Sequence, residues 1–387
     1  MDTQKLDQTY IANTYARFPV TIVKGKGSLV WDDTGKEYID LSTGIAVDIF
    51  GVADEEWMAA VTKQLGTLQH ISNLYYTEPC VKLAQMLCEK TGMKKVFFGN
   101  SGAEANECAI KAARKWSEEK KGKDYSTIIT LKNSFHGRTI TTLAATGQDV
   151  FHHDFTPLTA GFVYAEPNDL ADLEQLIKAN KCAAVMMEVV QGEGGVMPLD
   201  EAYVKGAAKL CEQYDLLLIC DEVQVGNGRS GKLYGYMHYG VQPDIVSTAK
   251  GLAGGLPLGA TLLGEKVQDV LSAGTHGSTF GGNPVCCAGA INVLSRLDEK
   301  MLEGVEERSA YIKQELADAK GVLGVSGLGL MLGIQTEKNA SDIIAACREK
   351  GVLVIKAKDK LRLLPALNIP MEQLQKAVAV IKACCAE

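Results

Sequence analysis

Residues 216–250 read LLLICDEVQVGNGRSGKLYGYMHYGVQPDIVSTAK, and this stretch decides the expected fold. The apolar run Leu216–Cys220 leads directly into Asp221, and a second run, Ile245–Val246, leads to Lys250. Short apolar runs bounded by polar residues are typical of buried strands in a parallel sheet. In an open α/β sheet, ligands bind at the edge formed by the carboxyl ends of the strands. The stretch therefore predicts an acid and a lysine at a ligand-binding edge.

Three earlier segments show the same pattern of an apolar strand that ends in polar groups. They are Val96–Phe98, Thr127–Leu131 and Ala183–Met187. After the first of them, the turn at residues 99–102 opens a helix expected over Ala103–Lys120, whose apolar residues recur at helical spacing. A glycine-bearing turn at a helix N-terminus offers free backbone N–H groups and suits a phosphate. Because parallel strands end at one edge, we expect all five clusters to converge.

Composition narrows the class of protein. A chain of 387 residues exceeds what one hydrophobic core usually fills, and a net charge of −7 gives no electrostatic footprint for nucleic acid. The N-terminus lacks the apolar segment of a signal peptide, and the uncharged stretch Val270–Ser295 is too glycine-rich for a membrane span. The eleven cysteines are scattered, which is typical of reduced thiols in the cytoplasm. Six histidines without clustering predict no metal site.

The order of patterns suggests three parts. Residues 1–50 form an N-terminal segment with a hairpin over Trp31–Asp40, which we expect to pack with the smaller domain. Residues 51–289 form a large α/β domain, with mostly parallel strands between helices. Residues 290–387 form a smaller α+β domain that ends in a helix opened by Pro370.

The acid and the lysine suggest a particular cofactor. A carboxylate that can keep a pyridinium nitrogen protonated, together with a lysine that can form a Schiff base, is what pyridoxal phosphate requires of a protein. The alternative is that Asp221 caps a helix and Lys250 is a solvated loop residue, since both situations are common.

Six motifs in sequence strengthen the first interpretation. They are Asn100–Ala105 (NSGAEA), Phe135–Thr139 (FHGRT), Gln191–Gly195 (QGEGG), Asp221–Gln224 (DEVQ), Lys250-Gly251 and Gly277–Pro284 (GSTFGGNP). In order and spacing they resemble the class III (subgroup II) pyridoxal-phosphate aminotransferases along almost the whole chain. The resemblance implies the fold-type I architecture of pyridoxal-phosphate-dependent transferases, pyridoxal 5′-phosphate as cofactor, and a homodimer with shared active sites.

Within that family the chain looks most like the branch that acts on N-acetylornithine. Tyr15–Val20, Ser72–Tyr76 and Leu361–Pro365 carry this likeness. It implies transfer of the terminal amino group to 2-oxoglutarate, which gives N-acetylglutamate 5-semialdehyde and glutamate in arginine biosynthesis. The chain departs from the family at Asp48–Glu55, where Asn-x-x-Gly-His-x-His-Pro is common, and at Val225, where threonine is frequent. Neither change touches the expected cofactor groups.

The resemblance assigns the cofactor contacts. Lys250 is the expected Schiff-base lysine and proton carrier, and Asp221 holds the ring nitrogen. Gln224 resembles the partner of the ring's phenolic oxygen, with Phe135 and Val223 on the two ring faces. The remaining expected cofactor contacts are Ser101, Gly102, Ala103, Glu222 and Thr279. Of these, Gly102 and Ala103 offer N–H groups to the phosphate, and Thr279 resembles a residue that reaches the phosphate of a neighbouring subunit.

Two arginines are expected to bind carboxylates, because the planar guanidinium suits them. By resemblance, Arg138 receives the α-carboxylate of the acetylated substrate, with Ser278 nearby. Arg362 receives that of glutamate or 2-oxoglutarate, and Glu193 neutralises Arg362 while the amine substrate is bound. Surface ion pairs are the alternative for both arginines. Glu188 supports the cofactor at most.

Several functions stay open at this stage. Ornithine, succinylornithine and 4-aminobutyrate aminotransferases share the reactive end, and glutamate-semialdehyde aminomutase also keeps the lysine and the aspartate. A protein that only binds the cofactor is disfavoured by the intact ionisable residues. A nicotinamide dehydrogenase is disfavoured because no G-x-G-x-x-G follows the first strand of the α/β region.

Overall fold

The central sheet confirms the expected α/β class. The computed structural model describes residues 2–387, and across these residues the largest sheet has seven strands. All run in one direction except β12, which is antiparallel to both of its neighbours. In sheet order the strands are β4 (Lys95–Gly99), β12 (Gly259–Leu263), β11 (Ile245–Thr248), β10 (Leu217–Asp221), β7 (Cys182–Met187), β5 (Thr127–Leu131) and β6 (Phe162–Ala165).

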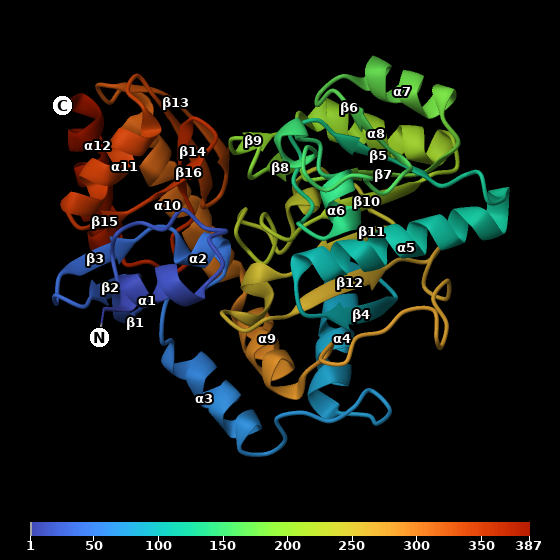
Figure 1. Cartoon of the computed structure of the whole chain (residues 1–387), viewed down its shortest axis with the longest axis horizontal. Helices are drawn as coiled ribbons and strands as arrows, with labels where there is room; N and C mark the ends of the chain where they lie inside the picture. The colour runs from blue at the N-terminus through green and yellow to red at the C-terminus, as the bar shows by residue number, and fades with distance from the viewer. Residues whose placement is uncertain (1) are drawn as a thin grey trace.

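Helices cover both faces of this sheet (Figure 1). Helix α5 (Gly102–Lys121) packs across one face, and α7 (Leu170–Ala179) and α8 (Glu201–Gln213) pack on the other. Strand β10 shows why both faces need a cover, since alternate residues belong to different clusters: Leu217 lies with the α5 cluster and Leu218 with the α8 cluster. A strand buried on both faces reads as a continuous apolar run, which is the pattern seen in the sequence.

The first turn of α5 lies against the antiparallel strand. Gly259 at the start of β12 pairs with Gly99 at the end of β4. A Cβ at Gly259 would lie 2.2 Å from the backbone oxygen of Ser101, so only glycine allows this approach. The sequence analysis did not anticipate β12 or β6.

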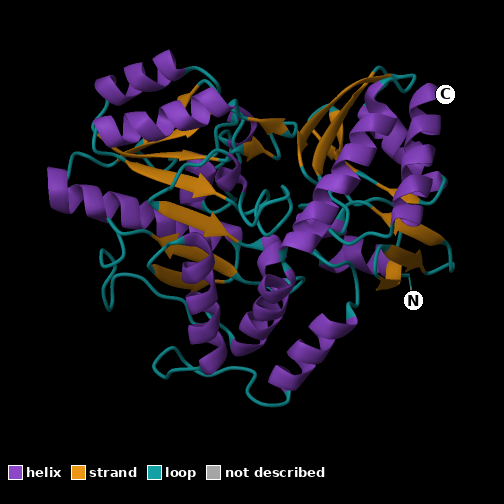
Figure 2. Cartoon of the chain, turned by 180° about the vertical axis from the view of Figure 1, so that it is seen from behind, coloured by secondary structure: helices purple, strands orange, loops and turns teal. Residues whose placement is uncertain are grey.

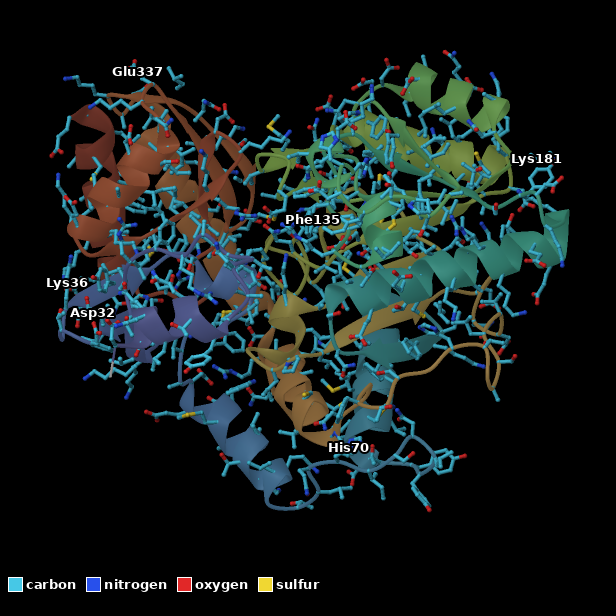
Figure 3. The ribbon with its side chains drawn as sticks, in the orientation of Figure 1. Asp32, Lys36, His70, Phe135, Lys181 and Glu337 are labelled. Atoms are coloured by element: carbon cyan, nitrogen blue, oxygen red, sulfur yellow. The ribbon has the colours of Figure 1, made fainter. Side chains whose placement is uncertain are left out.

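The N-terminal strands pair with a strand from the far end of the chain. The expected hairpin is confirmed: β2 (Leu29–Asp32) and β3 (Glu37–Asp40) are antiparallel, and Asp32 Oδ1 accepts hydrogen bonds from the backbone N–H groups of Thr34 and Lys36 in the turn, each at 2.9 Å. Figure 3 shows Asp32 and Lys36 at the outer edge of the molecule. Strand β1 (Ile22–Lys26) extends the sheet on one side, and β15 (Val352–Leu353) pairs in parallel with β3 on the other.

A second small sheet belongs to the C-terminal region, beside the N-terminal strands (Figure 1). The division at residues 50 and 289 remains a proposal, and residue 290 itself falls within helix α9, which packs on α3 and α4. The C-terminal elements are α10 (Glu299–Ala317), β13 (Val322–Leu328), β14 (Met331–Thr336), α11 (Ala340–Glu349), β16 (Ile355–Ala357), β17 (Lys360–Leu363) and α12 (Met371–Ala386).

The other elements connect these layers, and Figure 2 shows them by type. They are α1 (Thr3–Tyr10), α2 (Thr43–Ala46), α3 (Glu55–Leu65), α4 (Glu78–Thr91), α6 (Ile140–Ala145), β8 (Val190–Gln191), β9 (Met197–Pro198), α9 (Pro284–Arg296) and the 3-10 helices η1 (Asp149–Phe151), η2 (Gly235–His238) and η3 (Lys250–Ala253). Within residues 2–387, every helix is too short or too polar to cross a bilayer.

Candidate active site

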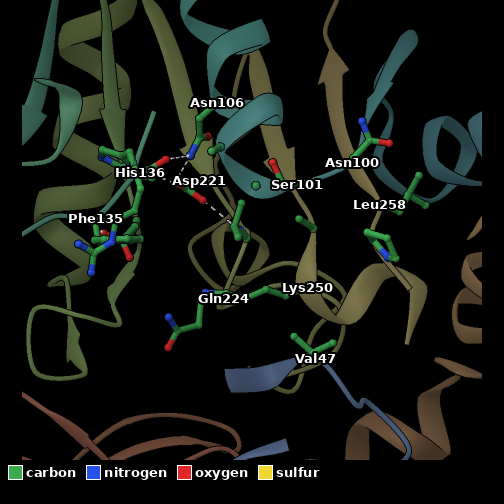
Figure 4. Close-up of a pocket in the computed structure, with 18 of the residues that line it drawn as sticks. Val47, Asn100, Ser101, Asn106, Phe135, His136, Asp221, Gln224, Lys250 and Leu258 are labelled. Atoms are coloured by element: carbon green, nitrogen blue, oxygen red, sulfur yellow. Dashed lines mark hydrogen bonds and ion pairs between the residues drawn. The ribbon is translucent and has the colours of Figure 1, made fainter. Parts of the chain in front are cut away.

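One cavity of about 640 Å³ opens at the carboxyl edge of the central sheet. Phe135 marks its place near the middle of the molecule in Figure 3, and Figure 4 shows the lining at close range. Most of the expected site residues line this cavity: Ser101, Gly102, Ala103, Phe135, Arg138, Asp221, Val223, Gln224 and Lys250. The expected residues outside this lining are Glu193, Glu222, Ser278, Thr279 and Arg362.

The start of α5 forms one wall. Ser101 caps the helix, its side-chain oxygen accepting a hydrogen bond from the N–H of Glu104 at 3.2 Å. The N–H groups of Gly102 and Ala103 are in the first turn, where no carbonyl of the helix can accept them. A Cβ at Gly102 would lie 2.6 Å from Val223 Cγ1, so the glycine lets this wall close against the strand that carries Asp221. The arrangement suits an anion at the helix N-terminus.

Asp221 is buried and held by three donors. Its Oδ2 accepts from Asn106 Nδ2 and lies beside His136 Nδ1, each at 2.8 Å, and its Oδ1 accepts from the N–H of Val223 at 3.0 Å. Figure 4 draws the contacts of Asp221 to His136 and Asn106 as dashed lines. Hydrogen bonds of this kind favour the charged carboxylate. A buried carboxylate at the floor of the cavity is suited to face a protonated ring nitrogen.

The sequence analysis missed two of these residues. His136 stands inside the FHGR motif, so a polar side chain directly after a strand end was the available signal. Asn106 had none beyond being a polar residue beside the apolar stripe of the helix. Both are buried, and the second Asn106 amide hydrogen goes to the carbonyl of His136 at 2.8 Å. They act together in orienting Asp221.

Lys250 begins η3, directly after β11. Figure 4 shows its side chain extending into the cavity beside Gln224. Its φ of 46° is left-handed, a conformation that residues with a Cβ rarely adopt. Burial lowers the pKa of Lys250, and the negative charge of Glu193 opposes that shift. A lysine with a lowered pKa is more readily neutral, as a nucleophile or general base requires.

The side chains of Arg362, Glu193 and Gln224 are joined to one another by hydrogen bonds. Arg362 Nη1 donates to Glu193 Oε1 at 2.5 Å and to Gln224 Oε1 at 3.1 Å, and Gln224 Nε2 donates to Glu193 Oε1 at 3.4 Å. Burial raises the pKa of Glu193, but the charge and the hydrogen bond of Arg362 outweigh it, so that the pKa is lowered overall. Glu193 is therefore charged and neutralises the buried Arg362, as expected for a closed carboxylate site.

Arg138, unlike Arg362, has no carboxylate partner among residues 2–387. It is exposed at the cavity, and within residues 2–387 it makes no hydrogen bond or ion pair. Its guanidinium is held by aromatic rings, 4.6 Å from the centroid of Phe151 and 5.7 Å from that of Phe135. Stacking leaves the N–H edge of a guanidinium available. The chain thus offers one open and one closed arginine for carboxylates.

Ser278 and Thr279 are not brought to Arg138 within the chain. Ser278 Oγ accepts from Asn100 Nδ2 at 3.2 Å and from the N–H of Gly281 at 3.0 Å, and Thr279 is exposed. Both lie in the loop between β12 and α9, outside the lining of the cavity. A role for Thr279 at a neighbouring subunit's phosphate remains a proposal.

Glu222 requires a correction. The sequence analysis counted it among the cofactor contacts, but its two carboxylate oxygens accept hydrogen bonds from the backbone N–H groups of Gly235 and Tyr236, at 2.7 and 2.8 Å. The residue is fully buried and does not line the cavity. Neighbouring residues at a strand end point to opposite sides, so Asp221 faces the cavity and Glu222 faces the loop behind it. We assign Glu222 a structural role.

We expect Glu222→Gln to change stability and its pH dependence, not cofactor binding. Burial raises the pKa of Glu222 to about 8, against an ordinary value near 4.5, so the stability it contributes is present at low pH and is lost as pH rises between the two. At pH 5 the amide nitrogen of the variant faces one of the two backbone N–H groups, so the free energy of unfolding falls by about 1–3 kcal/mol. The difference from the wild type shrinks toward pH 8.5, because the wild type then loses the contribution of the protonated Glu222. Urea unfolding at both pH values checks this, with cofactor affinity unchanged; a fall in cofactor affinity would return Glu222 to the site.

Glu188 lines the cavity and joins two of its walls. Its Oε1 accepts from the N–H of Phe135 at 2.8 Å and its Oε2 accepts from the N–H of Gly192 at 3.3 Å. Burial raises the pKa of Glu188 to about 7, and the neighbouring His136 opposes that shift. The residue therefore ties the Phe135 wall to the loop that carries Glu193.

The residues around the cavity fit pyridoxal phosphate. The N–H groups of α5 suit its phosphate, Asp221 suits its ring nitrogen, and Lys250 suits its reactive carbon. Phe135 and Val223 both line the space, so the flat ring of the cofactor would have an apolar side chain on each of its faces. Each chemical part of the cofactor thus has a group of matching chemistry.

Comparisons with known proteins agree with this fit. The model of the class-III aminotransferase family matches residues 10–385. An acetylornithine aminotransferase of Haemophilus ducreyi is 50% identical over 386 residues, covering 99% of this chain and 98% of that protein. Among solved structures, ornithine aminotransferase from Toxoplasma gondii has a TM-score of 0.95 at 33% identity, covering 99% of this chain and 94% of that one.

A second solved structure has the activity expected from the sequence. N-acetylornithine aminotransferase from Stenotrophomonas maltophilia has a TM-score of 0.86 at 36% identity, covering 99% of this chain and 98% of that one. The family match spans nearly the whole chain, and the relatives align along almost their full lengths. The chain therefore belongs to the class-III aminotransferases and is a fold-type I transferase that depends on pyridoxal phosphate.

Proposed function

We propose that the protein transfers the terminal amino group of N2-acetyl-L-ornithine to 2-oxoglutarate, giving N-acetyl-L-glutamate 5-semialdehyde and L-glutamate in arginine biosynthesis. The observation that carries the proposal is the contrast between Arg138, which lines the cavity, and Arg362, which contacts the lining residue Gln224. Arg138 is open to a carboxylate, and Arg362 is closed by Glu193. Relatives from Haemophilus ducreyi and Caldanaerobacter subterraneus, 50% and 44% identical, are acetylornithine aminotransferases.

The amine substrate would bind with its α-carboxylate on Arg138 and its terminal amine near Lys250. When bound, pyridoxal phosphate supplies an electron sink and carries the nitrogen between the two substrates. Lys250 Nζ removes a proton from the carbon that carries the terminal nitrogen. Its lowered pKa makes the neutral amine available for that step. The carboxylate of Asp221 would face the ring nitrogen and favour its protonated form.

The second substrate needs a second carboxylate site. Arg362 would receive the α-carboxylate of 2-oxoglutarate once Glu193 moves away, and Gln224, bonded to both, moves with this exchange. While Glu193 is paired with Arg362, the guanidinium would not bind the α-carboxylate of an amino acid. The α-amino group of that amino acid would therefore not be placed for reaction. One charged pair thus allows two substrates of different shape to use one cavity.

The absorbance of the bound cofactor tests the proposal. The purified protein is mixed with N-acetylornithine, and separately with free ornithine, succinylornithine and 4-aminobutyrate. We expect rapid conversion of the cofactor to its aminated form with N-acetylornithine, and reversal by 2-oxoglutarate. Faster conversion by another amine would replace the substrate and keep the reaction class. Turnover of glutamate semialdehyde without any 2-oxoglutarate would favour an aminomutase.

We expect Glu193→Ala to open the Arg362 site. Without its partner, the buried guanidinium is left for the α-carboxylate of 2-oxoglutarate, so the KM for 2-oxoglutarate falls about tenfold, corresponding to about 1.4 kcal/mol. Steady-state kinetics at saturating amine check this. Glu201→Ala, which removes an exposed carboxylate paired with Lys205, serves as the control. An unchanged KM would separate Glu193 from the Arg362 site.

We also propose that two copies share their active sites. Large apolar side chains are exposed around the loop that carries Thr279, with Tyr76 99% and Leu74 86% exposed, and Phe280 in the loop itself 59% exposed. Asn73, next to Leu74, donates from Nδ2 to the carbonyl oxygens of Ser278 and Gly281, so the two exposed segments meet. Exposed apolar side chains that gather in one place are typical of an interface between subunits. Sedimentation of the purified protein should give twice the mass of the chain, and a monomer would refute the shared site. Location in the cytoplasm stays a prediction from the sequence.

A further inference from the structure

The loop between β10 and η2 makes a contact that the proposed reaction does not use. It contains Asn227, which is buried at 1% exposed and has a left-handed φ of 57°. Asn is one of the few residues with a Cβ that adopts this conformation readily. Neither the family motifs discussed above nor the lining of the cavity includes Asn227.

Both amide hydrogens of Asn227 point to the segment that leads into Lys250. Its Nδ2 donates to Thr248 Oγ1 and to the carbonyl oxygen of Ala249, each at 3.0 Å. That carbonyl belongs to the peptide bond that joins Ala249 to Lys250. Ala249 is extended, with a φ of −166°, and Lys250 follows with a left-handed φ of 46°. The carbonyl that Asn227 holds therefore directly precedes the left-handed residue.

The loop that carries Asn227 is itself firmly fixed. Gly226 has no room for a Cβ, which would lie 2.6 Å from the carbonyl oxygen of Glu222. Arg229 is fully buried, and its Nη1 donates to the carbonyl oxygens of Leu330 and Pro365. These contacts attach the loop to the C-terminal region, just beyond the strand of Arg362. Asn227 therefore contacts Thr248 and Ala249 from a loop that is anchored to the C-terminal region.

We propose that Asn227 is a positioning residue for Lys250: its carboxamide holds the Ala249 carbonyl so that the lysine keeps the left-handed backbone that directs Nζ into the cavity. A misplacement of about 1 Å in a reacting group can cost about 10²-fold in rate. Without the two hydrogen bonds, the Ala249 carbonyl keeps the N–H of Leu252, at 2.9 Å, but loses its side-chain donor, and the backbone of Lys250 relaxes toward an ordinary φ. The inference rests on the proposed role of Lys250.

Asn227→Gly is the test variant, because glycine adopts φ 57° without strain and removes the side chain alone. Asn168→Gly is the matched control. Asn168 also has a left-handed φ, of 65°, and also bonds a backbone group, the N–H of Asp200 at 2.9 Å, but it is exposed and far along the chain. Asn227→Ala adds backbone strain to the loss of the side chain, so we expect its defects to equal or exceed those of Asn227→Gly.

Three measurements follow Lys250 itself. In the protein without cofactor, labelling of Lys250 by an amine-reactive reagent is measured against pH by peptide mass spectrometry; we expect its midpoint to move up by about one pH unit, toward ordinary lysine. In the loaded enzyme, the pH midpoint of the cofactor absorbance should shift as well. The maximal rates of the two half-reactions, with the amine and with 2-oxoglutarate, should fall by the same factor, about 10–100-fold. The KM of each substrate should stay within about threefold of the wild-type value.

Asn168→Gly should move none of these values. A lower Tm for Asn227→Gly with unchanged labelling and absorbance would overturn the inference and leave Asn227 a structural residue. A loss confined to one of the two steps would also overturn it, because Lys250 serves both. The labelling and absorbance need no amine substrate, so failure here is distinguishable from a wrong substrate assignment.

Discussion

Lys250→Ala should lower kcat by about 10⁴-fold, the upper end of what a positioned acid–base group contributes. The loss would have two sources, since we propose this side chain both as the attachment point for the cofactor and as the group that moves the proton. Stopped-flow absorbance of each step measures it. We expect methylamine or a similar small amine to restore part of the rate in proportion to its concentration, because the truncated side chain leaves space for an external base in the cavity.

The control is Lys209→Ala, which removes an exposed lysine on α8, and this variant should keep full activity. The fold should be retained in both variants, as seen in circular dichroism. A Lys250→Ala protein that kept more than about one tenth of the wild-type kcat would contradict the assignment of this lysine. Full restoration by a carboxylate buffer instead of an amine would contradict its role as base.

Asp221→Asn should lower kcat by about 10²–10³-fold, the usual cost of removing one fixed group that stabilises charge in a dry site. Asparagine keeps the shape and can still accept from His136 and Asn106, but it lacks the charge that keeps the ring nitrogen protonated. The cofactor should also bind more weakly. Single-turnover kinetics and cofactor titration check both effects.

Asp200→Asn is the matched control, since Asp200 stands at the start of α8 and makes no side-chain cap bond. Its substitution should leave kcat and cofactor affinity unchanged. An Asp221→Asn variant within threefold of wild-type kcat would show that the ring nitrogen does not need this charge. A variant that failed only in cofactor affinity would assign Asp221 to binding alone.

Strands β10, β7 and β5 were predictable, because each is buried on both faces and follows an apolar run that ends in polar residues. Strand β10 reads as an unbroken apolar run ended by Asp221, and β7 and β5 read alike. Strand β12 was not predicted. Its sequence, GATLL, is short and begins with small residues, and its place depends on pairing with β4, far away in the chain. Local periodicity contains no information about such a pairing.

The site shows the same limit at the level of single side chains. The motifs predicted Lys250, Asp221 and the turn at the start of α5 as cofactor contacts, because the chemistry of a cofactor demands those residue types, and the structure places all three at one cavity. Glu222 was misassigned and His136 was missed for one reason: the sequence does not say toward which side a residue next to a strand end points. The contact of Asn106 with Asp221 requires the helix to lie across the sheet, which only packing decides.

The position of β12 between β4 and β11 has a consequence for how the protein is made. On the ribosome, β4 emerges about 160 residues before the partner strand that it contacts, which at 5–20 residues per second is on the order of 8–30 seconds. During that interval the apolar side of α5 has no β12 to cover it, and the bond from Thr261 Oγ1 to the carbonyl of Ala105 cannot form. The turn at the start of α5, where we propose that the phosphate binds, therefore gains its contacts with β12 only late in translation.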